Sequence, residues 1–245
     1  MKKIAAIIEA RMSSSRLPGK VLKMIGNKPS LLHTIHRLRM VKNIDDIIVA
    51  TTYNKSDDLI VNFCKKNKVS FCRGSEQNVL NRVLKTAKQY KVKTIVEITG
   101  DSVFLDYKLI DQAIKIYNSN NYDFVANCAI NPTFIAGFDV RIFSTKKLEK
   151  VKTKITDKSD FEHVSSFFWR NPNLFKIFNI KPSKKLQSGK IFLGLDTKED
   201  LKMLREIYKS LGKNDKYFDA NEIVDFIKKN PRINKFNAKI IRNKV

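Results

Sequence analysis

The sequence is poor in cysteine, glycine and acidic residues, and it contains no long apolar run. Its three cysteines, Cys64, Cys72 and Cys128, are too few and too scattered for a disulfide framework or a zinc module, so we expect reduced packing residues. No stretch approaches the ~18–20 apolar residues of a membrane span, and the five after Lys3 are too few for a secretory leader. We therefore expect no membrane insertion and a cytoplasmic location.

The eight glycines form neither of the common phosphate-binding motifs. A P-loop needs Gly, four residues and then Gly-Lys-Ser/Thr, but Gly19-Lys20 is followed by Val21, and position 14 is serine. The Gly-x-Gly-x-x-Gly of dinucleotide-binding loops is missing near the first apolar run, and no catalytic triad pattern stands out. Any phosphate site in this chain therefore has another arrangement.

Acidic residues number 24 against 48 basic ones, which gives a net charge of +24. A nucleic-acid-binding protein is one interpretation of this excess. However, most of the basic residues are lysines scattered over every segment, and the densest stretch, 146–158, also contains Glu149 and Asp157. We expect no specific nucleic-acid binding, and we expect the charge to attract small anionic substrates.

Short apolar runs alternate with amphipathic segments over the first 130 residues. This alternation predicts an α/β fold with a mostly parallel sheet and helices on both faces. The expected strands are 3–8, 46–51, 69–72, 94–98 and 124–127, and the expected helices are 31–41, 56–66, 76–90 and 107–118.

The regular alternation of short apolar runs and amphipathic segments is lost between residues 129 and 194. Strands are expected at 138–143 and 174–180 around a helix at 159–170, and helices at 198–211 and 221–229 follow. Because no repeat, low-complexity tract or flexible linker interrupts the chain, we expect one domain over residues 1–245.

The first expected strand leads into a basic, hydroxyl-rich loop. This loop carries Arg11, Arg16 and Lys20 together with three serines at 13–15 and Gly19. Small side chains let backbone N–H groups close on an anion, and fixed cations neutralise it, so the loop is typical of a phosphate site. A solvated loop in a lysine-rich protein is the competing interpretation.

Polar residues also follow the next three expected strands, at Thr51-Thr52, Arg73-Gly74 and Gly100-Asp101. The carboxyl ends of parallel strands meet at one crevice, where ligands bind in such sheets. Asp101 there is suited to Mg²⁺, although an aspartate at this place is as often a helix or turn cap. Asp196, in Gly194-Leu195-Asp196-Thr197, is open to the same two interpretations.

The string Ala10-Arg11-Met12-Ser13-Ser14-Ser15-Arg16-Leu17-Pro18-Gly19-Lys20 resembles the signature of sugar-activating cytidylyltransferases. It is nearest to the SpsF-like spore-coat polysaccharide branch, relatives of the CMP-Kdo and CMP-sialic acid synthetases. Further segments similar to the family are 49–52, 56–58, 71–76, 79–82, 137–140, 162–164 and 194–200. The resemblance implies a three-layer, mostly parallel, Rossmann-like sheet of the nucleotide-diphospho-sugar transferase (GT-A-like) type. It also implies that residues 129–194 bind the acceptor and contribute to a homodimer.

The resemblance further implies that the chain couples CTP to a nonulosonic or Kdo-like acid sugar, giving a CMP-sugar and pyrophosphate for surface polysaccharide. Arg11, Lys20 and Asp101 would be catalytic, and Asp101 and Asp196 would hold Mg²⁺. Asp139, Glu162 and His163 would bind the acceptor, although His163 on an amphipathic helix is about as typical of packing. The nucleotide would contact Ala10, Arg11, Met12, Ser13, Ser14, Ser15, Arg16, Lys20, Thr52, Arg73, Gly74 and Gly100.

Three positions depart from the family pattern. Glu9 replaces the usual Gln or Pro, and its charge could repel the triphosphate or join the metal shell. Ser102-Val103 replaces a common Cys-Pro, and Arg141 replaces an acidic residue, both on the expected acceptor side. A glycosyltransferase using a nucleotide sugar is one alternative, but Asp101-Ser102-Val103 lacks the second carboxylate of its Asp-x-Asp motif. A nucleotidyltransferase with another NTP, such as UTP, and a non-enzymatic nucleic-acid-binding protein are the others.

Overall fold

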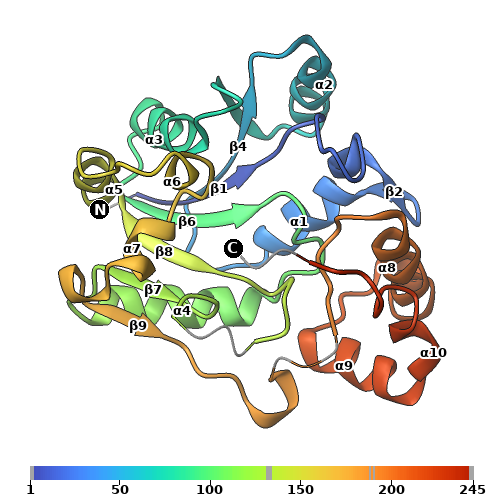
Figure 1. The fold of residues 1–245 in the computed structure, drawn as a ribbon. Helices are drawn as coiled ribbons and strands as arrows, with labels where there is room; N and C mark the ends of the chain where they lie inside the picture. The colour runs from blue at the N-terminus through green and yellow to red at the C-terminus, as the bar shows by residue number, and fades with distance from the viewer. Residues whose placement is uncertain (1–2, 131–133, 188, 190, 243–245) are drawn as a thin grey trace.

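A computed structural model describes residues 3–130, 134–187, 189 and 191–242. A seven-stranded sheet runs through the molecule in the order β5-β4-β1-β6-β8-β7-β9, with helices on both sides (Figure 1). The strands are β1 (Ile4–Glu9), β4 (Asp46–Thr52), β5 (Ser70–Gly74), β6 (Thr94–Thr99), β7 (Phe124–Ala126), β8 (Arg141–Ser144) and β9 (Ile177–Asn179). The five strands expected before residue 130 are all confirmed, with ends shifted by one or two residues.

The four strands β5, β4, β1 and β6 are mutually parallel, and β7 is parallel to β9. Among the described strands of this sheet, only β8 pairs antiparallel, and it does so with both of its neighbours, β6 and β7. The sheet is therefore mostly parallel, which confirms the predicted fold class. All four carboxyl ends of the parallel block lie at one edge, where the basic loop begins.

The two faces of the sheet are covered by different helices because consecutive side chains of a strand point to opposite sides. Ile8 packs with α1 (Ser30–Leu38), α2 (Asp58–Lys66) and α4 (Tyr107–Ser119) on one face. Ile7 packs with α3 (Val79–Gln89), α5 (Thr145–Lys152) and α7 (Ser166–Arg170) on the other. Figure 1 shows α8 (Lys198–Leu211), α9 (Ala220–Lys229) and α10 (Pro231–Asn234) grouped beside the first face.

The expected strand at 138–143 begins only at Arg141, so its first half was wrong. The Asn127 amide donates to the Phe138 carbonyl (2.8 Å), and the Val140 N–H donates to the Asn127 side-chain oxygen (2.9 Å). These bonds take the place of a strand ladder. Asp139 therefore lies in a turn that a buried asparagine holds.

The expected helix at 159–170 is broken into α6 (Ser159–Glu162) and α7. The Ser166 hydroxyl donates to the His163 carbonyl at 2.6 Å and also contacts Asp160. Such local side-chain bonds compete with the helical ladder and end α6 at Glu162. The structure also contains α5, α10 and a short hairpin of β2 (Met24–Ile25) and β3 (Lys28–Pro29), none of which was predicted.

Within the described ranges, none of the helices combines the length and apolar character needed to span a bilayer. The three cysteines are free, as expected, and burial raises the pKa of the Cys64 and Cys128 thiols to about 12. Thiols with such pKa values are protonated at neutral pH and serve as packing groups.

Candidate active site

The loop after β1 is a closed turn with a fixed backbone. The Gly19 N–H donates to the Met12 carbonyl (2.8 Å), and Gly19 has a φ of 69°, in the left-handed region that favours glycine. The Ser30 hydroxyl at the start of α1 donates to the Lys20 carbonyl (2.8 Å). The loop thus presents the Lys20 side chain from a rigid base.

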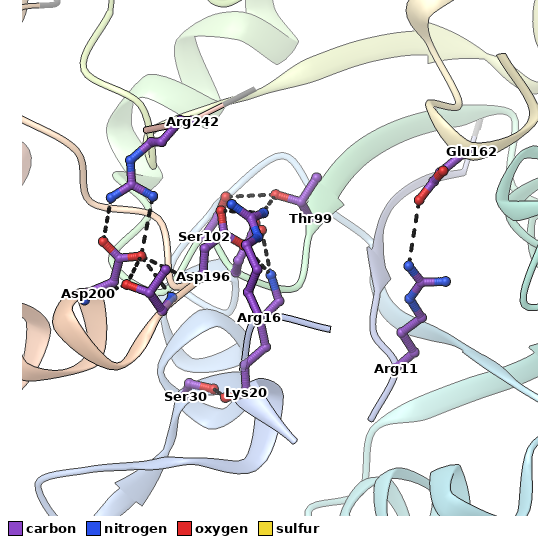
Figure 2. A network of polar contacts seen from close by, with 12 residues as sticks. Arg11, Arg16, Lys20, Ser30, Thr99, Ser102, Glu162, Asp196, Asp200 and Arg242 are labelled. Atoms are coloured by element: carbon purple, nitrogen blue, oxygen red, sulfur yellow. Dashed lines mark hydrogen bonds and ion pairs between the residues drawn. The ribbon is translucent and has the colours of Figure 1, made fainter. Parts of the chain in front are cut away.

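Lys20 lies between two carboxylates from distant parts of the chain (Figure 2). Its Nζ is 2.9 Å from Asp101 Oδ2 and 2.8 Å from Asp196 Oδ1. Arg16 contacts the other oxygen of Asp196 at 3.0 Å. The Leu195 N–H donates to the Asp101 carbonyl (3.0 Å), so backbone pairing holds the two segments together. The structure therefore brings together four of the residues that the sequence singled out.

Asp101 and Lys20 are held in their charged forms by their neighbours. Burial opposes the charge on Asp101, but Lys20 and the Thr99 hydroxyl (2.6 Å) outweigh it and hold the pKa of that carboxyl below its usual value. Burial likewise opposes the charge on Lys20, but Asp101 and Asp196 together raise its pKa. The Asp101 carboxylate and the Lys20 ammonium therefore face each other as a charged pair.

This donor set fits a magnesium ion that arrives with phosphates. Mg²⁺ is typically bound by one or two carboxylates, with phosphate oxygens and water completing the shell. Asp101 and Asp196 supply that pair, and no group of three or more Asp, Glu, His or Cys side chains suited to a metal exists among the described residues. The predicted metal ligands lie side by side, and metal binding itself stays a prediction.

Asp200, to which the sequence analysis gave no function, fixes the position of Asp196. Its Oδ2 accepts from the Asp196 N–H (3.1 Å) and the Thr197 N–H (2.9 Å) in a capping box at the start of α8. Its side chain is fully buried and also meets Arg242 (2.6 Å) and Asn237 (2.7 Å). The Thr197-x-x-Asp200 spacing is the sequence signal that could have identified this cap.

Arg11 reaches toward the other side of the crevice. Its guanidinium is 3.7 Å from Glu76 and 3.6 Å from Glu162, the last residue of α6 (Figure 2). The Ser13 hydroxyl also contacts Glu76. Hydrogen bonds from Ser13 and then Asn54 lower the pKa of the Glu76 carboxyl. Arg11 therefore links the loop to α6, where Glu162 and His163 were predicted to meet the acceptor.

Asp57 is another buried carboxylate, and it holds the loop after β1 in place. It accepts from the Met12 N–H (2.7 Å) and the Thr52 N–H (3.1 Å), which ties the loop to the end of β4. Arg73 donates to the Thr52 carbonyl (2.7 Å) and pairs with Asp58 (2.6 Å). Thr52 and Arg73 thus lie at the crevice with protein partners, and their contact with nucleotide stays a prediction.

Two glycines at strand ends allow close packing, Gly100 against the end of β1 and Gly74 against α3. A Cβ on Gly100 would lie 2.5 Å from the Glu9 carbonyl, and one on Gly74 would lie 2.8 Å from the Arg82 side chain. The Gly100 N–H donates to that same carbonyl at 2.9 Å. Gly100 therefore permits close packing of β6 on the end of β1. Its predicted contact with nucleotide, like that of Gly74, stays a prediction.

Glu9 lies with a group of charges on the α3 side of the sheet. Its neighbours there are Glu97, Arg82 and Arg141. Burial, followed by the like charge of Glu97, raises the pKa of Glu9 to about 8, so the carboxyl is largely neutral at pH 7. Glu9 therefore adds little negative charge next to the phosphate loop, and the Asp101 carboxylate is close enough to make a small contribution to the rise in its pKa.

Arg141 stands directly across from Glu97 in the antiparallel β6–β8 pair, and it lies 3.7 Å from Asp139. Its departure from the family pattern is therefore matched by an acidic residue on the neighbouring strand. Burial raises the pKa of both Glu97 and Asp139.

The comparisons with known proteins agree with this geometry. Residues 5–225 match the cytidylyltransferase family model. Spore coat polysaccharide biosynthesis protein SpsF of Bacillus subtilis is 30% identical over 237 residues, 94% of this chain and 96% of that protein. A cytidylyltransferase structure from Leptospira borgpetersenii is 31% identical with a TM-score of 0.90, covering 99% of this chain and 100% of the other. CMP:2-keto-3-deoxy-manno-octonic acid synthetase, solved with CTP, shares the fold with a TM-score of 0.64 at 14% identity, over 85% of this chain and 99% of that one.

A mostly parallel sheet with a basic loop and paired carboxylates at one edge fits a nucleotidyltransferase, the class that the family model and the relatives show. The chain belongs to the cytidylyltransferase family, and it is a CTP-dependent enzyme. The predicted family is confirmed, and the interpretation as a non-enzymatic nucleic-acid-binding protein is wrong.

Proposed function

We propose that the protein transfers a cytidylyl group from CTP to an acid sugar, giving a CMP-sugar and pyrophosphate. The cluster of Lys20, Asp101 and Asp196 carries this proposal, because it joins a phosphate-binding cation to two ligands suited to Mg²⁺. The product is proposed to serve surface polysaccharide or glycan biosynthesis, which is supported by the likeness to SpsF.

In the proposed reaction an acceptor oxygen attacks the α-phosphorus, the bond to the β-phosphate oxygen breaks, and pyrophosphate leaves. Lys20, Arg16 and Arg11 neutralise the charge that builds on the leaving group. A magnesium ion held by Asp101 and Asp196 would offset phosphate charge and orient the triphosphate. Positioning and electrostatics dominate such transfers, so no nucleophilic side chain is required.

The acceptor is proposed to lie between α6 and the turn before β8. Glu162 is held near the loop by Arg11 (3.6 Å). Asp139 contacts Arg141, the first residue of β8, at 3.7 Å. His163 lies at the break between α6 and α7. We propose that these residues orient the acceptor, and that segment 129–194 also contributes to a homodimer.

The experiment is calorimetric titration of the full chain with CTP, UTP, GTP and ATP, with and without Mg²⁺. Selective CTP binding that strengthens with Mg²⁺ is expected. Pyrophosphate release is then measured with CTP and a panel of Kdo and nonulosonic acids. Asp101→Asn and Asp196→Asn should each abolish it, whereas Asp225→Asn, at an exposed position of α9, should leave it unchanged. Full activity of both variants would refute the metal assignment, and equal binding of UTP would refute the choice of CTP.

A further inference from the structure

Lys20 occupies the position between the two carboxylates that are proposed to hold the metal. Its ammonium contacts one oxygen of each carboxylate at 2.8–2.9 Å, and only 15% of its side chain is exposed. An ammonium and a divalent cation cannot share the same two oxygens, because like charges at contact distance repel strongly in a partly buried site. Lys20 and Mg²⁺ therefore compete for the same ligands.

The surroundings let the ammonium leave without disturbing either carboxylate. Asp101 keeps its bond from the Thr99 hydroxyl (2.6 Å), and the Asp196 backbone is held by Asp200 (3.1 Å). The Lys20 backbone is fixed by Ser30 (2.8 Å), so only the flexible four-carbon stem of the side chain needs to move. The two ligands are thus preorganised, and the lysine is the part able to change position.

We propose that Lys20 is an internal counter-ion that excludes the metal until a triphosphate arrives. The ammonium then moves from the carboxylates to the phosphates, and the freed oxygens of Asp101 and Asp196 take the Mg²⁺ that accompanies the nucleotide. This proposal rests on the proposed function of the same site. It makes nucleotide binding a precondition of tight metal binding, and it keeps the two carboxylates neutralised in the empty enzyme.

Lys20→Met removes the charge and keeps a long apolar side chain. The proposal predicts opposite effects on the two ligands: Mn²⁺ alone should bind at least tenfold more tightly than to the wild type, whereas CTP should bind at least tenfold more weakly. Lys23→Met removes the same charge from an exposed position three residues away, and it should behave as the wild type. If Lys20 had only a structural role, its replacement would weaken the binding of Mn²⁺ and of CTP together.

The measurement is titration of the full chain with Mn²⁺ in the absence of nucleotide, with free Mn²⁺ followed by electron paramagnetic resonance. Tighter Mn²⁺ binding by Lys20→Met, lost again in Lys20→Met/Asp196→Asn, supports the proposal. Binding no tighter than that of the wild type overturns it. If circular dichroism shows that Lys20→Met does not fold, Lys20→Gln provides the same comparison.

Titration of the wild type with CTP and Mn²⁺ together separates this proposal from the proposed function. Absence of CTP binding there would refute the proposed function, whatever the variant does. Normal CTP binding with tight Mn²⁺ binding to the empty wild type would refute the counter-ion alone.

Discussion

At the scale of single residues, Glu9 shows how a position that departs from its family is accommodated. The side chain is surrounded by Glu97 and two arginines, and its pKa is raised to about 8 mainly by burial. A carboxyl with a pKa raised in the folded state binds more protons folded than unfolded between about pH 4.5 and 8. Its contribution to stability is therefore present below pH 4.5 and is lost as the pH rises to 8.

Glu9→Gln should remove this pH dependence, because the amide resembles the protonated carboxyl and does not ionise. We expect the melting temperature of the wild type to fall between pH 5 and 8.5 by several degrees more than that of the variant. Differential scanning calorimetry at four pH values measures this. Parallel curves for the two proteins would contradict the raised pKa of Glu9.

Gly100 is a second residue whose identity the neighbours determine. Gly100→Ala would place a methyl group 2.5 Å from the Glu9 carbonyl and 3.2 Å from Val21. Overpacking of this kind typically costs about 1–3 kcal/mol. Urea unfolding should show this loss, and Gly189→Ala, whose Cβ would meet no atom of the described residues within 4 Å, should show little change. Equal stability of the two variants would mean that β6 shifts freely away from β1.

At the scale of elements, the start of α8 connects helix capping to the site. Thr197→Ala removes one half of the capping box that includes Asp200, at a cost of about 1 kcal/mol. We expect it also to weaken magnesium-dependent CTP binding, because the Asp196 backbone is held by the same carboxylate. Calorimetry with CTP and Mg²⁺ is the measurement.

The capping box of α9, formed by Asp219 and Glu222, provides a matched control. Glu222→Ala should lower stability by a similar amount and leave CTP binding unchanged. If both variants weakened CTP equally, the effect would come from general loosening of the last helices.

Elements also show what could be predicted from the sequence and what could not. The strands of the parallel block were predicted because each is a short apolar run bounded by polar turns, a local property. The break at His163 was missed because the Ser166 hydroxyl competes with the helix, and the late start of β8 was missed because Asn127 replaces the ladder. The same limit applies at the site: Arg242 meets Asp200 across 42 positions, and no local pattern encodes that contact.

The residues of the charged cluster were easier to predict than the residues that hold them in position. Lys20, Asp101 and Asp196 each follow or precede an identifiable element, and the family resemblance paired them before any distance was known. Asp57 was not assigned a function, because its value lies in accepting N–H groups from Met12 and Thr52, which are adjacent only in the fold.

At the scale of the whole molecule, the net charge of +24 predicts two kinds of anion binding with different salt dependence. Scattered lysines should bind duplex DNA weakly and without sequence preference, with an affinity that falls steeply with salt. Binding of CTP with Mg²⁺ at the crevice should fall much less, since the cations there are partly buried and are screened less. Titrations at 50 and 300 mM salt should therefore abolish the first and retain the second. An equal loss of both would mean that CTP is bound by the surface charge alone.

Contacts between distant parts of the chain also determine the order in which the site can form during synthesis. Asn237 and Arg242 hold the buried Asp200, which in turn holds the backbone of Asp196. During synthesis these two residues leave the ribosome after every other described part of the site, when the strands are already available to pair. A growing chain therefore has its phosphate loop before its second carboxylate is fixed in place. A chain whose translation stops before residue 237 should therefore lack activity. It should also bind too little CTP to compete with the full-length enzyme.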